Sequence, residues 1–155
     1  MSVSIFTDGE VAYLASQRLG RLATVQANGT VQNSPVGFSY NTVFETIDIG
    51  GRNMQASQKF KNLAANSRVA FVVDDVPSLD PWQVRCLEIR GTAEAILDPT
   101  DSAVPYPSAI IRIHPQRIIS FGIDAPGTGR GKRNVDSGPP ARHHNRAAGE
   151  PLPGD

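Results

Sequence analysis

The sequence predicts a mainly β (α+β) domain, a barrel-like sheet of six to seven antiparallel strands with two or more helices. Short apolar runs that alternate with polar residues recur along the chain, and turn residues separate them. Only two stretches have the 3.6-residue period of a helix. Strands that follow one another as antiparallel neighbours indicate a barrel-like sheet rather than a doubly wound one.

The first predicted element is a helix that begins after Thr7. Thr7 and Glu10 have the spacing of a capping box, in which each side chain accepts from the other residue's amide. Val11, Leu14 and Leu19 continue at helical spacing. We expect Gly20 to end this helix.

Three strands are predicted next, at residues 22–26, 30–40 and 43–51, and we expect them to form an antiparallel meander. Asn28-Gly29 predicts a type I′ hairpin turn, which needs positive φ at both central residues. Pro35 cannot donate to a sheet ladder, so it marks a bulge or an edge strand.

The second helix is predicted after residues 50–53. Ser57 or Asn53 is the expected N-cap, and we expect Phe60, Leu63 and Ala64 to face inward.

The remaining strands are expected at residues 68–74, 83–97, 110–113 and 117–123, with a kink near Gly91. Residues 75–80 are predicted to form a loop. Residues 114–116 (His-Pro-Gln) are predicted to form a turn between the last two strands.

The chain has 155 residues and divides into a folded domain, residues 1–125, and a tail, residues 126–155. In the tail, 11 of 30 residues are Gly or Pro, and Val135 and Leu152 are its only large apolar residues. Such a segment buries too little surface to offset its ordering entropy. We expect it to be disordered.

Composition excludes several classes of protein. Lys plus Arg and Asp plus Glu are both 15, which disfavours a general nucleic-acid binder. Cys86 is the single cysteine, so no intrachain disulfide forms, and few histidines make a metal site improbable. With no secretory signal and no membrane-length apolar run, we expect a soluble cytoplasmic protein.

One segment has the character of a phosphate site. Gly50, Gly51, Arg52 and Asn53 follow a strand, and Ser57 and Lys59 follow at the start of a helix. Glycine allows close backbone approach, helix amides favour anions, and Arg and Lys grip phosphate. The alternative, an ordinary solvated helix with surface lysines, fits the pattern equally well.

Four segments in order carry a family resemblance: residues 14–41, residues 47–75, residues 80–96 and residues 111–124. Their sequences are LASQRLGRLATVQANGTVQNSPVGFSYN, IDIGGRNMQASQKFKNLAANSRVAFVVDD, DPWQVRCLEIRGTAEAI and IRIHPQRIISFGID. The chain thereby resembles the pyridoxamine 5′-phosphate oxidase-like split β-barrel proteins, and among them the F420-dependent oxidoreductases. The resemblance implies a split β-barrel and a homodimer with the cofactor between subunits.

The resemblance also implies roles for particular residues. Ser57 and Lys59 match the family's phosphate-binding helix start, but Gln58 stands where the family has Arg, which leaves Arg52 as the guanidinium. Pro35, Val36 and Gly37, with Gly50, are expected to line the cofactor ring through their backbone. Trp82 matches an aromatic position that the second subunit places near the cofactor, and packing alone explains it nearly as well.

The function implied is an F420 (deazaflavin)-dependent reductase that transfers a hydride to an unidentified, electron-poor small molecule. No catalytic residue is assigned, since the cofactor carries the chemistry. An FMN-dependent reductase or oxidase is one alternative, and a non-catalytic F420, flavin or haem binder is another. His114 is the only axial ligand that the folded domain offers to haem. A Trp- and Arg-rich C-terminal segment typical of pyridoxamine oxidases is missing, which disfavours vitamin B6 oxidation.

Overall fold

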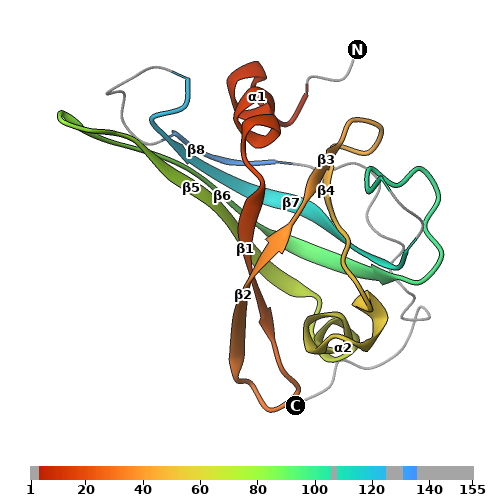
Figure 1. Ribbon diagram of the computed structural model, residues 1–155. Helices are drawn as coiled ribbons and strands as arrows, with labels where there is room; N and C mark the ends of the chain where they lie inside the picture. Colours follow the sequence, from red (N-terminus) through yellow and green to blue (C-terminus); the bar gives the residue numbers. More distant parts are fainter. Residues whose placement is uncertain (1–3, 106–107, 125–130, 136–155) are drawn as a thin grey trace.

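Eight antiparallel strands, two α-helices and one 3-10 helix make up the part of the chain that the computed structural model describes, residues 4–105, 108–124 and 131–135 (Figure 1). In chain order the elements are α1 (Asp8–Ser16), β1 (Leu19–Val25), β2 (Val31–Gly37), β3 (Ser39–Asn41), β4 (Thr46–Ile49), η1 (Met54–Ala56), α2 (Gln58–Ala65), β5 (Arg68–Leu79), β6 (Trp82–Ile96), β7 (Ile110–Phe121) and β8 (Gly131–Asn134).

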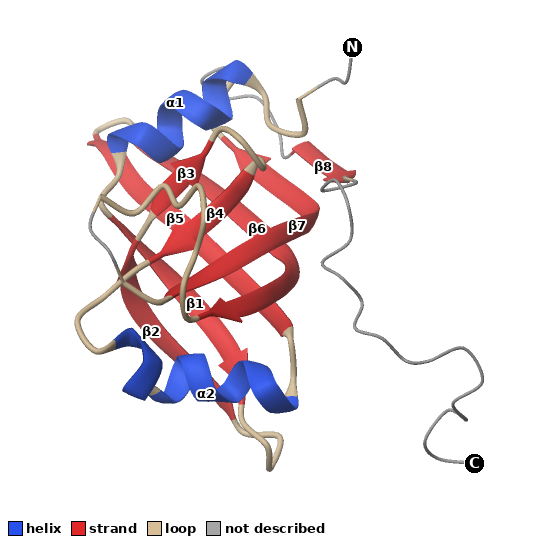
Figure 2. Ribbon diagram, turned by 90° about the vertical axis from the view of Figure 1, so that its right-hand side faces the viewer, coloured by secondary structure: helices blue, strands red, loops and turns tan. Residues whose placement is uncertain are grey.

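The strands form one curled sheet in the order β2-β1-β5-β6-β7-β4-β3, with β8 paired to β7. β4 pairs with the first half of β7 and β8 with the second half. The two helices lie across opposite ends of the curled sheet (Figure 2). This confirms the predicted split β-barrel with two helices.

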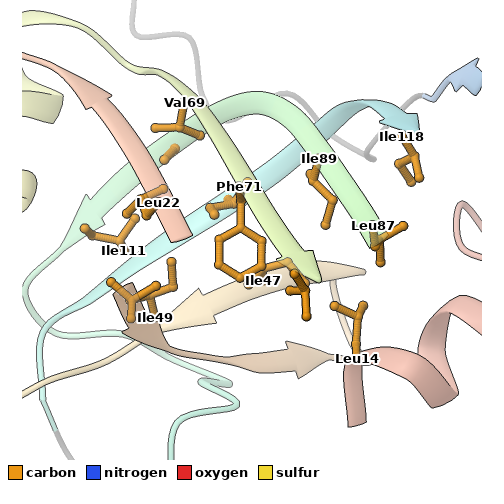
Figure 3. Close-up of a cluster of buried hydrophobic side chains, with 14 of the residues drawn as sticks. Leu14, Leu22, Ile47, Ile49, Val69, Phe71, Leu87, Ile89, Ile111 and Ile118 are labelled. Carbon is orange, nitrogen blue, oxygen red and sulfur yellow. The ribbon is translucent and has the colours of Figure 1, made fainter. Parts of the chain in front are cut away.

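Branched and aromatic side chains fill the interior of the curled sheet (Figure 3). Phe71 on β5 is fully buried, and a Cβ on Gly20 of β1 would lie 2.2 Å from its Cζ. Gly20 is therefore a packing residue in a strand, and the prediction that it ends the first helix is wrong. That helix ends at Ser16.

The capping box at the start of α1 is confirmed. The Glu10 amide donates to Thr7 Oγ1 over 3.0 Å, and the Thr7 amide donates to Glu10 Oε1 over 2.9 Å. Tyr13 and Leu14 of α1 are buried on the barrel.

The first hairpin differs from the expected type I′ turn. Val25 pairs with Val31, and the Gln26 amide donates to the Thr30 carbonyl, so the loop has three residues. Among them only Gly29 has a positive φ, +88°, as in three-residue hairpin loops. Pro35 lies on β2, an edge strand without a bulge, which agrees with the edge alternative.

The third predicted strand is shorter than expected, and the meander ends after its first hairpin. Asn41 Oδ1 accepts from the amides of Val43 and Phe44, which holds these residues in a turn. The strand β4 therefore starts at Thr46, and it pairs with β3 and β7 rather than with β2.

Ser57 is the N-cap of α2, where its Oγ accepts from the Phe60 amide over 3.3 Å, as predicted. Leu63 is buried, but Ala64 is exposed. Asn62 occupies the inward position instead, because its amide group donates to Thr24 on β1 and Gln32 on β2.

Two connections predicted in the second half of the chain are strands. Residues 75–79 continue β5, which turns into β6 at the cis Asp80–Pro81 bond. Residues 114–116 lie within β7, where a register shift opposite Gly91 accommodates the extra residue. The predicted kink at Gly91 is thus a bulge, and a Cβ there would lie 2.0 Å from the His114 carbonyl oxygen.

Part of the predicted tail is ordered. Residues 131–134 form β8, and the Val135 amide donates to the Gln116 carbonyl. Backbone pairing needs no apolar side chains, so the low hydrophobicity of this segment gave no sign of the strand β8. The boundary at residue 125 remains a prediction, and residues 125–130 and 136–155 lie outside the described structure. Within the described residues, no helix has the length and hydropathy needed to span a membrane.

Candidate functional site

A cleft of about 360 Å³ lies where α1, β2, β3 and β4 end or begin. Its lining comes from the end of α1, the β2–β3 junction, the end of β4 and the loop before β7: Ala15, Ser16, Gln17, Arg18, Gly37, Phe38, Ser39, Asp48, Gly50, Val104 and Pro105. At the end of a strand, backbone N–H and C=O groups often have no partner in the sheet, so they are available to a ligand.

Two glycines leave part of the cleft without side chains. Gly37 ends β2 and Gly50 follows β4. A Cβ built on Gly37 meets no atom within 4 Å, so the space above this residue is open. A flat ligand can therefore approach the Gly37 backbone directly, and the role expected for both glycines stays a prediction.

Arg18, just after α1, gives the cleft a positive charge. In the described part of the chain it forms no ion pair, and neither do Arg52 and Lys59. Arg52 is exposed and Lys59 half-buried on the segment that leads from Gly50 into α2. These uncompensated cations fit an anionic ligand.

The segment after Gly50 has the bends that the glycine pair suggested. Asn53 has a φ of 54°, and the 3-10 helix η1 follows it. Ser57 Oγ donates to the Met54 carbonyl over 2.6 Å while it caps α2. The Ser57 hydroxyl therefore has its proton committed, and it can donate to a phosphate oxygen only after its bond to the Met54 carbonyl breaks.

Asp48, which lines the cleft, belongs to a buried ion pair. Asp48 on β4 lies opposite Arg112 on β7, and Arg112 Nε donates to Asp48 Oδ1 over 3.0 Å. Burial alone would raise the pKa of Asp48. Hydrogen bonds from Arg112, the Ala103 amide and Asn41, together with the Arg112 charge, outweigh burial and lower that pKa below its usual value. Asp48 therefore stays ionised and is not a proton donor.

The other predicted ring-lining residues lie beside the cleft rather than in its lining. The Val36 side chain is buried in the core, so only its backbone is available to a ligand. Pro35 is exposed on the edge strand β2. The structure thus brings Gly37 and Gly50 to one cleft and places Gly51, Arg52 and Asn53 directly after it.

Trp82 lies in a different region of the subunit. It is 65% exposed at the start of β6 and lines a second groove of about 510 Å³ with Phe121 and Ile123. Tyr13 Oη of α1 donates to Asp75 on this hairpin over 2.8 Å, which ties the hairpin to the α1 end of the barrel. The α2 end, with Lys59, is opposite (Figure 2). Within one subunit, Trp82 does not join the other predicted residues.

His114 and Cys86 lie outside the cleft lining. His114 Nε2 lies 2.7 Å from Glu94 Oε2, so ligation of haem through that nitrogen would have to displace Glu94. Cys86 is half-buried on β6, opposite Phe121 of β7.

We did not predict Arg18, the Asp48–Arg112 pair, or the loop residues Val104 and Pro105 from the sequence. For the ion pair a signal exists: each residue is a single charge inside an apolar strand, in the runs TIDI and IIRI. Charges in such runs are almost always paired when buried. No comparable signal marks Val104 and Pro105, which belong to an irregular loop.

Comparisons with known proteins agree with this architecture. The family model described as pyridoxamine 5′-phosphate oxidase matches residues 6–121. A 5a,11a-dehydrotetracycline/5a,11a-dehydrooxytetracycline reductase from Streptomyces rimosus subsp. rimosus is 50% identical over 122 residues, which are 77% of this chain and 84% of that protein.

Two solved structures share the fold at low sequence identity. The heme binding protein from Mycobacterium smegmatis superposes with a TM-score of 0.60 at 19% identity, over 85% of this chain and 60% of that one. The FAD binding protein from Mycobacterium smegmatis gives a TM-score of 0.55 at 23% identity, over 75% of this chain and 96% of that one. At these identities the likeness concerns the fold alone.

Proposed function

The chain belongs to the pyridoxamine 5′-phosphate oxidase family, and from this premise we propose that it is an F420-dependent reductase of flat, fused-ring, electron-poor substrates. It is an oxidoreductase, since a relative that is 50% identical over 122 residues is named a reductase. The name of that relative supports a polycyclic enone of the dehydrotetracycline kind as the substrate class.

The observation that carries the proposal is the glycine-lined cleft with Arg18 in its lining, a cation that forms no ion pair within the described residues. Gly37 and Gly50 give a surface without side chains for a planar ring, and Arg18 lies at the same cleft. Arg52, Asn53, Ser57 and Lys59 follow along the chain, where they would hold a phosphate and an acidic extension. The residues present therefore fit a planar, anionic cofactor.

When bound in reduced form, the deazaflavin supplies the hydride. The chain's own contribution is orientation and electrostatics. Asp48, a carboxylate in the cleft lining, keeps its negative charge, so we assign no general acid and expect the product's proton to come from solvent. The backbone at Gly37 and Gly50 would set the face from which the substrate approaches.

A homodimer is part of the proposal. Trp82, Leu79 and Val76 lie exposed on the hairpin of β5 and β6, which extends beyond the barrel (Figure 1). An apolar arm of this kind favours contact with a second subunit. Trp82 would then approach the partner's cofactor rather than that of its own subunit.

Separate titrations of the purified protein with F420 and FMN, followed by turnover, test the function. We expect tighter binding of F420, and oxidation of reduced F420 when a dehydrotetracycline-type enone is added. Tighter binding of FMN with flavin-dependent turnover would replace the cofactor in the proposal. Binding of either cofactor without turnover on quinones, enones and nitroaromatics would favour a non-catalytic binder.

A further inference from the structure

Residues 100–105 form one wall of the cleft. Val104 and Pro105 line it on this side, while Gly37 and Gly50 line it from the strands. This wall belongs to the irregular connection between β6 and β7, so no sheet ladder fixes its position.

Three side chains on the neighbouring strands hold the wall instead. Arg112 Nη2 donates to the Thr100 carbonyl over 3.4 Å, Asn41 Nδ2 donates to the Asp101 carbonyl over 2.7 Å, and the Ala103 amide donates to Asp48 Oδ2 over 3.0 Å. All three residues are buried: Arg112 is 6% exposed, Asn41 2% and Asp48 0%. The wall is therefore tied at three nearly consecutive residues to groups that cannot move freely.

These three side chains also fix one another. Asp48 accepts two bonds from Arg112, one from Asn41 over 2.8 Å and one from Thr46 over 3.1 Å, besides that from Ala103. These five hydrogen bonds exceed the roughly four lone-pair sites of a carboxylate, so no site is left for a further donor. The Arg112 guanidinium lies 4.6 Å from the centre of the Phe44 ring, which closes its other side.

We propose that Asn41, Asp48 and Arg112 are positioning residues that set the width of the cleft and thereby its affinity for the planar ring of the cofactor. The inference rests on the proposed function for the identity of that ring. A buried ion pair adds little net stability compared with apolar packing of the same volume. The Asp48–Arg112 pair matters here because charged hydrogen bonds depend on direction. They hold the 100–105 loop at a fixed distance from the strands, which apolar contacts would not do.

The distance matters because part of the cleft lining is glycine backbone and part is the apolar pair Val104 and Pro105. These groups offer a flat ring mainly dispersion contacts. A gap of about 0.5–1 Å loses roughly a quarter to a half of such an attraction. A small outward shift of the wall therefore weakens ring binding without touching the phosphate-binding segment.

Arg112→Lys tests the inference, because it keeps the positive charge but loses the two-pronged contact with Asp48 and the bond to Thr100. The two probes are F420 and the phosphate-free deazaflavin, which is the ring with its ribityl chain. We expect both dissociation constants to rise by the same factor, about tenfold for one charge-assisted hydrogen bond. Arg52→Ala should weaken F420 alone.

Two further measurements separate positioning from general destabilisation. Val69→Ala truncates the core on β5 and leaves the wall untouched, so ring affinity should stay at the wild-type value. Hydrogen exchange of the Ala103 amide should speed up in Arg112→Lys and not in Val69→Ala. Asn41→Ser, which removes the bond to Asp101, replaces Arg112→Lys if that variant does not fold.

The outcomes are distinct for the two proposals. Wild-type ring affinity in Arg112→Lys and in Asn41→Ser would overturn the inference and leave the proposed function intact. Failure of the wild-type protein to bind either deazaflavin would overturn the proposed function. In that case unchanged Ala103 exchange in the variants would overturn the positioning role as well.

Discussion

Asp48 and Arg112 are single charged residues inside apolar strands, and each is the other's ion-pair partner. Each is the one charged residue of its four-residue run, and their register across β4 and β7 places them opposite each other. Because both are buried, their pairing is obligatory. The sequence indicates that each charge needs a partner, but only the strand register identifies it.

The prediction about the phosphate concerns the exposed Arg52 and the half-buried Lys59. Arg52→Ala or Lys59→Ala should weaken F420 binding by about 1–3 kcal/mol, the range for hydrogen bonds to charged groups. Isothermal titration with F420 measures the effect. Arg68→Ala removes an exposed charge from the start of β5 and serves as the control. Affinity that stays at the wild-type value in both test variants would show that another segment binds the phosphate.

At the scale of elements, β8 joins the two ends of the described chain. Its Arg133 donates to both carboxylate oxygens of Glu10 on α1, and over 2.7 Å to the Ile5 carbonyl. Glu10 is fully buried and also caps α1. The helix whose last turn lines the cleft is thus held by a strand from the far end of the sequence.

Arg133→Met should destabilise the protein by about 3 kcal/mol, because it leaves the buried Glu10 carboxylate without its charged partner. Urea unfolding measures the loss. The double variant Glu10→Gln with Arg133→Met should recover part of it, since no buried charge remains. Arg117→Met on β7, whose partner Asn134 is exposed, should stay within about 0.5 kcal/mol of the wild type. An equal loss of unfolding free energy in Arg133→Met and Arg117→Met would contradict a specific role for the Glu10–Arg133 pair.

For the whole molecule, the buried carboxylate predicts how stability depends on pH. The folded-state pKa of Asp48 is lowered, so its ionised form stabilises the fold fully above the unfolded-state pKa of about 3.9. This contribution decreases below that pH and is lost once pH falls through the folded-state pKa.

Asp48→Asn should therefore cost about 3–5 kcal/mol at pH 7, and the difference from wild type should shrink as pH falls below about 4. Urea unfolding at a series of pH values measures it. Asp74→Asn breaks the half-exposed pair with Arg21 and should cost at most about 1 kcal/mol. A difference for Asp48→Asn that does not change with pH would mean that its charge is not what stabilises the fold.

The sequence alone determined the elements whose signals are local. The capping box at Thr7 depends on a few neighbouring residues, and the structure confirms it. At Pro35 and at the start of α2 the sequence left two alternatives each, and the structure shows the edge position of Pro35 and the N-cap at Ser57. The four segments of the resemblance predicted the family that the comparisons confirm. The lengths of β5 and β7 and the strand β8 were missed, because pairing with a distant strand extends or creates a strand that local propensity does not mark.

Only the tertiary structure decided which residues share a site. It joined Gly37 and Gly50 in one cleft, placed Trp82 in a separate groove, and brought Arg112 to Asp48 and Arg133 to Glu10 across many residues of sequence. The physical reason is strand register, which burial of one sheet face fixes. Periodicity and turn chemistry act over a few residues, whereas register depends on every strand that the curled sheet brings together.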